Sequence, residues 1–150
     1  LGMHPVAGTW LARNSSTQEG AHVRKTMPIR TYMSPLPEEI DHRETLAAAI
    51  SRMNERRIHH LPVMDGPDVF GILSRQDVQD AWLRHGAGAG SQAVGEVCTT
   101  DPLKVSPVAT IPDVSRTMVE RGVTSALIVD EGMLVGIFTS IDALRVLAGL

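Results

Sequence analysis

The hydrophobic and polar positions of the chain follow the same order twice between Ile29 and Leu150. In each copy a short extended piece leads into apolar residues at helical spacing, and two aliphatic runs separated by a turn follow. A second amphipathic stretch closes each copy. This order predicts a β-α-β-β-α unit, present twice: helix 45–58, strands 60–64 and 69–74 and helix 75–86, then helix 110–123, strands 126–130 and 134–139 and helix 140–150.

The two copies align on each other without a gap when the chain is shifted by 65 residues. The heptapeptide GILSRQD, which begins at Gly71, then meets GIFTSID, which begins at Gly136. A glycine at the head of each heptapeptide predicts close packing or the close approach of another backbone. Self-similarity at a fixed period indicates a duplicated unit. The sequence therefore predicts four parts: a loosely ordered arm over 1–27, a first repeat over 28–85, a flexible glycine-rich joint over 86–92 and a second repeat over 93–150.

The composition predicts a globular protein with an aliphatic core. Hydrophobic residues make up 43% of the 150 residues but aromatic residues only 3%, and the formal net charge is −3. A weakly acidic chain gives no reason to expect nucleic acid or a membrane as a partner, and its apolar runs are too short to span a bilayer. The single cysteine allows no internal disulfide, and a cytoplasmic location is predicted.

The repeated heptapeptide places a hydroxyl and an acid at the start of the last helix of each copy: Ser74 with Asp77, and Thr139 with Asp142. One interpretation is helix capping, in which both side chains satisfy free N–H groups of the first turn. Aspartate is expected to reach back less well than glutamate, so its carboxylate could instead face outward and accept from two ribose hydroxyls. The residues alone leave both interpretations open.

The segments from MSPLPEEI (33–40) to GILSRQDV (71–78) and from CTTDPLKV (98–105) to GIFTSIDAL (136–144) resemble two CBS domains. The chain from 29 to 150 is thus similar to a tandem CBS pair, the Bateman module. The resemblance implies an α/β (α+β) fold of two β-α-β-β-α repeats related by pseudo-twofold symmetry. It also implies a homodimer and two clefts for an adenosine ligand, which would be AMP, ADP, ATP or S-adenosylmethionine, with no cofactor required.

The resemblance assigns residues to the two clefts. The hydroxyl and the acid of one repeat would hold the ribose, and the early strands of the other repeat would flank the adenine. The ribose residues are Thr139 and Asp142 in the first cleft and Ser74 and Asp77 in the second. The adenine-flanking residues are Met33, Glu38, Ile40, Ile58, His60 and Ile137 in the first cleft, and Ile72, Leu103, Val105, Val123 and Ser125 in the second.

Phosphate groups would need polar or cationic partners, and the two copies differ in what they offer. The first copy has His59 and His60 where the second has Thr124 and Ser125. The cleft with the histidines is therefore expected to bind more tightly. Glu38 at its rim would repel phosphate, which leaves a neutral or cationic adenosine ligand open. The residues assigned to phosphate are His59, Arg75 and Thr124, with Arg57 close by.

Other classes of function have less support in the sequence. A metal site is not predicted, because adjacent strand residues such as His59 and His60 point to opposite faces. An enzyme is not predicted, because no nucleophile with an oriented base is visible. The sequence thus predicts a non-catalytic regulatory module that senses adenosine nucleotides and acts on an unidentified protein target. The alternative is a ligand-free dimerisation scaffold in which Asp77 and Asp142 only cap helices.

Overall fold

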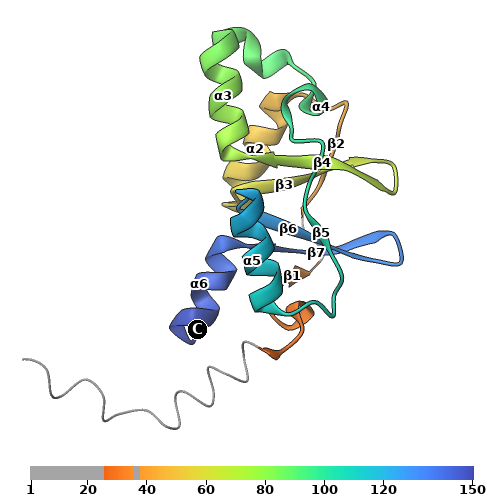
Figure 1. Cartoon of the computed structure of the whole chain (residues 1–150). Helices are drawn as coiled ribbons and strands as arrows, with labels where there is room; N and C mark the ends of the chain where they lie inside the picture. The colour runs from red at the N-terminus through yellow and green to blue at the C-terminus, as the bar shows by residue number, and fades with distance from the viewer. Residues whose placement is uncertain (1–25, 36–37) are drawn as a thin grey trace, which may run out of the picture.

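The computed structural model describes residues 26–35 and 38–150. Two similar units lie one above the other in Figure 1, each with helices on one side and a long β-hairpin that extends to the other side. The first unit contains β2 (Ile40–Asp41), α2 (Leu46–Arg56), β3 (His60–Asp65), β4 (Asp68–Ser74) and α3 (Arg75–His85). The second contains β5 (Lys104–Val105), α5 (Ile111–Arg121), β6 (Ser125–Asp130), β7 (Met133–Thr139) and α6 (Ser140–Ala148). The predicted β-α-β-β-α order is confirmed in both.

Each unit contains one hairpin with a short parallel strand beside it. β2 pairs in parallel with β3, which pairs antiparallel with β4, and β5, β6 and β7 repeat this arrangement. The register shifts at the same place in both hairpins, between Val63 and Met64 and between Ile128 and Val129. Because the bulge recurs at equivalent positions, the two units share details of the backbone as well as the order of their elements.

The first helix of each unit begins at a threonine and buries one face. Thr45 Oγ1 accepts from the N–H of Ala48, and Thr110 Oγ1 accepts from the N–H of Asp113, so both threonines act as N-caps. The amphipathic helices predicted from the apolar spacing are confirmed by the buried residues, which are Leu46, Ala49 and Met53 in α2 and Ile111, Val114 and Met118 in α5.

A short helical turn precedes each repeat in the sequence, and each of these turns packs into the core of the opposite unit. Ile29 in η1 (Ile29–Thr31) is fully buried in the core of the second unit. Val94 in α4 (Val94–Val97) is fully buried in the core of the first. A smaller cluster of Ile72, Leu127 and Ile137 joins strands of both units. The repeats are therefore continuous in sequence but exchange their leading segments in space.

The glycine-rich segment differs from its sequence-based interpretation. Residues Gly86–Ser91 form the 3-10 helix η2, and its Ala89 is fully buried in the core of the first unit. η2 packs against α3 and α2. The expectation of a flexible joint is therefore wrong for this segment, because its small side chains permit close helix packing.

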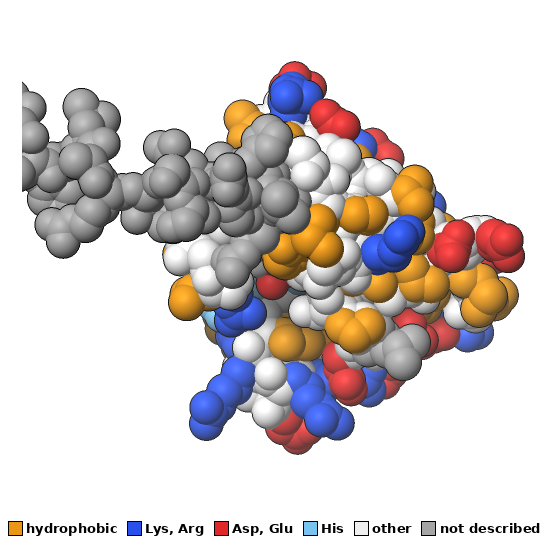
Figure 2. Space-filling view, turned by 90° about the horizontal axis from the view of Figure 1, so that it is seen from below, with side chains coloured by type: hydrophobic (Ala, Val, Ile, Leu, Met, Phe, Trp, Pro, Cys, Tyr) orange, Lys and Arg blue, Asp and Glu red, His pale blue; other side chains and the backbone are white. Residues whose placement is uncertain are grey.

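Two helices leave large apolar side chains on the surface. In α6, the exposed fractions of Ile141, Leu144 and Leu147 are 55%, 58% and 66%, and in α3 those of Trp82 and Leu83 are 47% and 86%. Figure 2 views the molecule from below, at the end where Figure 1 draws α6, and shows hydrophobic side chains spread over the surface there. An exposed apolar surface of this kind is typical of proteins that associate with a partner.

The expected arm over 1–27 lies outside the described residues except for 26 and 27. Within the described part of the chain, no helix is both long enough and apolar enough to cross a membrane.

Candidate functional site

The segments that precede the two repeats cross to the opposite unit and run beside its last strand. β1 (Ser34–Pro35) pairs antiparallel with β7, which places Ser34 opposite Ile137. At the equivalent place in the other half, Thr99 and Ile72 exchange two backbone hydrogen bonds of 2.9 Å. In both halves the leading segment of one repeat therefore lies beside the strand that carries the ribose residues predicted for the other.

Gly71 and Gly136 lie where these segments cross. A Cβ atom on Gly71 would collide with the backbone carbonyl oxygen of Thr99, and one on Gly136 would collide with the side chain of Met33. The close approach predicted from the two glycines is confirmed, because each leaves room for the crossing segment of the opposite repeat.

Both helix starts form capping interactions. The N–H of Ser74 donates to Asp77 Oδ2 over 2.8 Å, and the N–H of Asp77 donates to Ser74 Oγ over 3.1 Å. The N–H of Thr139 donates to Asp142 Oδ2 over 2.8 Å, and the Thr139 hydroxyl donates to the same oxygen over 3.2 Å. The expectation that aspartate reaches back poorly is wrong at both starts. Because these bonds use Oδ2, the Oδ1 atoms remain as acceptors for a ligand hydroxyl.

A cleft of about 800 Å³ lies between the two units, where β1 crosses to β7. It brings together most of the residues assigned to the first cleft: Glu38, Ile58, His59, His60, Ile137, Thr139 and Asp142. Two others of that group do not line it. Ile40 is 1% exposed in the core of the first unit, and Met33 packs against the core of the second.

Several lining residues were missed by the sequence analysis. Arg145 follows Asp142 by three residues on α6, so helical spacing could have identified it. Ser34 and Pro35 enter the lining only because β1 crosses to the second unit, and the sequence contains no signal of that crossing. The lining residues that were not assigned from sequence are Ser34, Pro35, Arg56, Ser140, Ile141 and Arg145.

Arginines outnumber acids in the lining of the cleft. Arg56 Nε lies 3.7 Å from Glu38 Oε2, and Arg145 Nη1 lies 3.9 Å from Asp142 Oδ1. The expectation that Glu38 repels phosphate is weakened by its partner, because Arg56 offsets the charge. With Arg57 as a third arginine, the lining favours an anionic ligand.

His60 connects the two repeats at the cleft. Its Nε2 atom lies 2.8 Å from Thr124 Oγ1 in the opposite repeat. Burial lowers the pKa of His60 and so does the nearby His59, although Asp77 and Asp142 act in the opposite direction. A lowered pKa keeps the imidazole neutral at pH 7. His60 can therefore hydrogen bond to a neutral part of a ligand but brings no positive charge for phosphate.

The sequence model of the CBS domain matches the chain twice, over residues 29–84 and residues 94–149. The chain belongs to the CBS-domain family. The two matched segments correspond to the two units of Figure 1, so the protein contains a tandem pair of CBS domains, as the resemblance implied.

Known proteins and solved structures match most of this chain. The inosine-5'-monophosphate dehydrogenase of Korarchaeum cryptofilum is 30% identical over 139 residues, which cover 88% of this chain and 27% of that enzyme. The chain spans less than half the length of the curated relatives it matches. The solved CBS domain of a bacterial CNNM/CorC family Mg2+ transporter in complex with ATP has a TM-score of 0.75 and 21% identity, covering 88% of this chain and 94% of that one. Hypoxic Response Protein I, solved with two coordinated zinc ions, has a TM-score of 0.69 and 28% identity, covering 79% of this chain and 97% of that one.

Most residues assigned to the first cleft line one cleft, but several other assigned residues lie elsewhere than expected. Thr124 lines the large cleft instead, where it contacts His60. Arg75, which was assigned to phosphate beside His59, is not among the residues that line the large cleft. Its Nη2 donates to Asn54 Oδ1 over 3.1 Å, near the end of α2. The adenine-flanking residues expected in the second cleft are buried or half-buried in the hydrophobic clusters of the two CBS domains or beside them: Ile72, Leu103, Val105, Val123 and Ser125.

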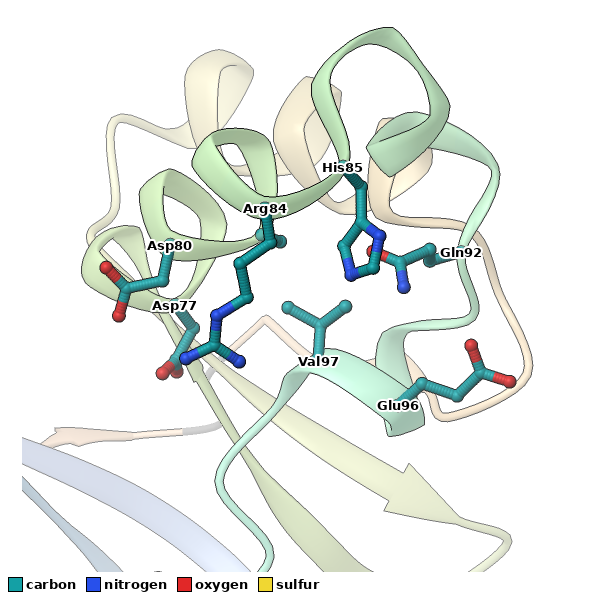
Figure 3. Close-up of a pocket in the computed structure, with 8 residues that line it drawn as sticks. Asp77, Asp80, Arg84, His85, Gln92, Glu96 and Val97 are labelled. Atoms are coloured by element: carbon teal, nitrogen blue, oxygen red, sulfur yellow. The ribbon is translucent and has the colours of Figure 1, made fainter.

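Asp77 lines a smaller pocket of about 130 Å³ between α3 and α4 (Figure 3). Arg84 and His85 from α3 and Glu96 from α4 surround this pocket, so its lining is mixed in charge. A volume of this size is well below the several hundred Å³ of a typical ligand site, so a nucleotide does not fit. Among residues 26–35 and 38–150, no group of three or more histidine, cysteine, aspartate or glutamate side chains could hold a metal ion.

Proposed function

We propose that this CBS pair is a regulatory module, without catalysis of its own, that binds an adenosine nucleotide in the large cleft. The observation that carries the proposal is the meeting of Thr139 and Asp142 from one repeat with His59 and His60 from the other. The cleft volume of about 800 Å³ lies within the range of small-molecule sites. Occupancy of the cleft would be transmitted to a protein target.

An adenosine nucleotide would use each part of the cleft. Its ribose hydroxyls would donate to Asp142 Oδ1, and its adenine would pack between the aliphatic side chains of Ile58 and Ile137. Its phosphates would face His59 and the arginines. The CNNM/CorC transporter domain solved with ATP supports AMP, ADP or ATP as the ligand class. S-adenosylmethionine carries no phosphate and suits the arginine-rich lining less well.

Signalling would follow from the position of the cleft between two CBS domains. A ligand that contacts both domains stabilises the arrangement in which both sets of contacts are made. It shifts the equilibrium only by the difference between its affinities for the two arrangements. A homodimer formed through the exposed apolar residues of α3 and α6 would carry the change to the target.

A ligand-free scaffold is the second candidate function. The observation that favours it is the exposed apolar surface of α3 and α6, which does not depend on any ligand. In that case the capping bonds of Asp77 and Asp142 would be their only role.

Thermal unfolding with AMP, ADP, ATP, S-adenosylmethionine and GTP separates the two candidates. At a ligand concentration of 100 times Kd, the free energy of unfolding should rise by about 2.7 kcal/mol. A Tm shift with adenosine nucleotides and none with GTP supports the regulatory module. The absence of a shift with every ligand would reject it in favour of the scaffold.

The variants Asp142→Ala and Asp77→Ala form a matched pair. Each removes the carboxylate that caps a helix, so each should lower the free energy of unfolding by about 1 kcal/mol. Only Asp142→Ala should also weaken nucleotide binding, by about tenfold or more, because only Asp142 lines the large cleft. Equal affinities of the two variants in calorimetric titrations would contradict the ribose assignment.

A further inference from the structure

The helices α2 and α5 end in the same backbone conformation but at different residues. α2 is followed by Arg57, with φ 53° and ψ 44°, and α5 by Gly122, with φ 64° and ψ 34°. The two positions are equivalent under the 65-residue shift. Glycine adopts the left-handed conformation freely, whereas a residue with a Cβ atom is strained there. The first repeat thus has an arginine with a strained backbone at the position where the second repeat has a glycine.

Helix stability does not account for this arginine. A basic side chain near a helix C-terminus is favourable, but Arg56 already supplies it in the last turn of α2, as Arg121 does in α5. In the described part of the chain, the Arg57 guanidinium has no hydrogen bond or ion pair. The side chain is exposed, so packing does not explain it either.

Arg57 lies in the lining of the large cleft. The other two arginines there, Arg56 and Arg145, lie within 4 Å of the carboxylates of Glu38 and Asp142. Among the described lining residues, Arg57 is therefore the arginine whose charge no neighbouring acid offsets. A strained backbone that holds an uncompensated cation at a cleft is typical of a binding residue.

We propose that Arg57 determines specificity in this cleft by selecting a ligand with a polyphosphate chain over a monophosphate or an uncharged adenosine compound. The proposal rests on the nucleotide-binding function proposed above. His60 is half-buried and neutral, whereas Arg57 is an exposed residue of the cleft lining. An exposed cation there reaches the part of the ligand that protrudes furthest, which is the outer phosphates. A guanidinium binds these oxygens through paired N–H donors.

The variant Arg57→Gly copies the second repeat and tests the proposal directly. The Kd for ATP should rise about tenfold, because a charge-assisted contact is lost, while the Kd values for AMP and adenosine should change less than about twofold. The Tm of the ligand-free variant should rise by about 2 to 4 °C, because the backbone strain is relieved. A residue with only a structural role would not make affinity for ATP fall while thermal stability rises.

Two further variants separate charge from strain. Arg57→Lys keeps the positive charge and the left-handed backbone, so its affinity for ATP should lie between those of the wild type and Arg57→Gly. Gly122→Arg introduces the same strain in the second repeat, where no atom lies within 4 Å of the added Cβ. It should lower Tm and leave the Kd for ATP unchanged.

Calorimetric titrations of the full chain decide among the outcomes. If the wild type binds ATP and Arg57→Gly binds it equally well, Arg57 is not the selecting residue and only the present inference is overturned. An equal loss for ATP and adenosine would overturn it too, because the phosphate chain would not be what Arg57 recognises. If the wild type binds no adenosine nucleotide, the proposed function fails and the inference fails with it.

Discussion

The two CBS repeats have the same backbone fold but differ in the charge of the side chains where they face each other. Bulges, N-cap threonines and crossing segments recur at equivalent positions in both halves. The side chains around the cleft do not repeat. The run Arg57, His59 and His60 in the first repeat corresponds to Gly122, Thr124 and Ser125 in the second.

This difference separates what the fold requires from what a ligand requires. Buried positions must fill the same space twice, so α2 and α5 bury residues of the same kind at the same places. Residues at the cleft do not have to satisfy a core and can diverge without loss of the fold. The asymmetric positions are therefore where a single preferred ligand site would be encoded.

The largest expected effect comes from adding a methyl group at each crossing point. The added Cβ of Gly71→Ala meets a backbone oxygen of Thr99, which cannot move without the strand, whereas that of Gly136→Ala first meets the flexible side chain of Met33. We expect losses in the free energy of unfolding of about 3 kcal/mol for Gly71→Ala and about 1 kcal/mol for Gly136→Ala. Urea unfolding of the two variants measures this. Equal losses would mean that both crossings relax equally.

A change of pH is expected to have a smaller effect on the free energy of unfolding. It arises at His60, whose equivalent in the second repeat is Ser125. The pKa of His60 is lowered in the folded state, so the unfolded chain binds more protons around pH 6. The contribution of neutral His60 to stability is therefore present above about pH 6.5 and decreases as the pH falls below that value. The variant His60→Ser, which copies the second repeat, removes this dependence.

Unfolding free energies of both proteins between pH 7.5 and 5.5 test the prediction. The wild type should lose more stability than His60→Ser as the pH falls. The other histidines are present in both proteins, so the difference between the two slopes reports His60. Parallel slopes would mean that burial does not hold the imidazole neutral.

The sequence was sufficient for features that each repeat determines by itself. Apolar periodicity predicted the helices and strands, and the glycines at 71 and 136 predicted close approach. The crossing of the leading segments was not predictable, because a repeat that packs on itself and one that exchanges segments with its neighbour give the same sequence pattern. Ile29 and Ser34 therefore lie in or beside the second unit without any local signal.

Strand orientation explains the errors within the candidate site. Ile40 was assigned to the cleft, but its pairing with Val63 turns it into the core, and a strand of two residues has too little alternation to show this beforehand. Arg57 was different, because the alignment already placed it opposite Gly122. The signal was present, but its meaning depended on the left-handed conformation at both positions.

The last comparison concerns reactivity and not stability. Cys98 is equivalent to Met33 and lies beside Gly71 as Met33 lies beside Gly136. Burial, followed by the charge of Asp77, raises the pKa of the Cys98 thiol to about 11. At pH 8 the thiolate fraction, and hence the rate of reaction with a disulfide reagent, should be about a hundredfold or more below that of an unhindered cysteine.

Removing the charge of Asp77 tests which of the two causes dominates the pKa of Cys98. Because burial is the larger cause, Asp77→Asn should accelerate the reaction only slightly, whereas 6 M urea should restore the rate of a free thiol. A native rate equal to the rate in urea would contradict the prediction. It would also mean that the crossing beside Gly71 opens readily, and then the loss expected for Gly71→Ala should shrink toward that of Gly136→Ala.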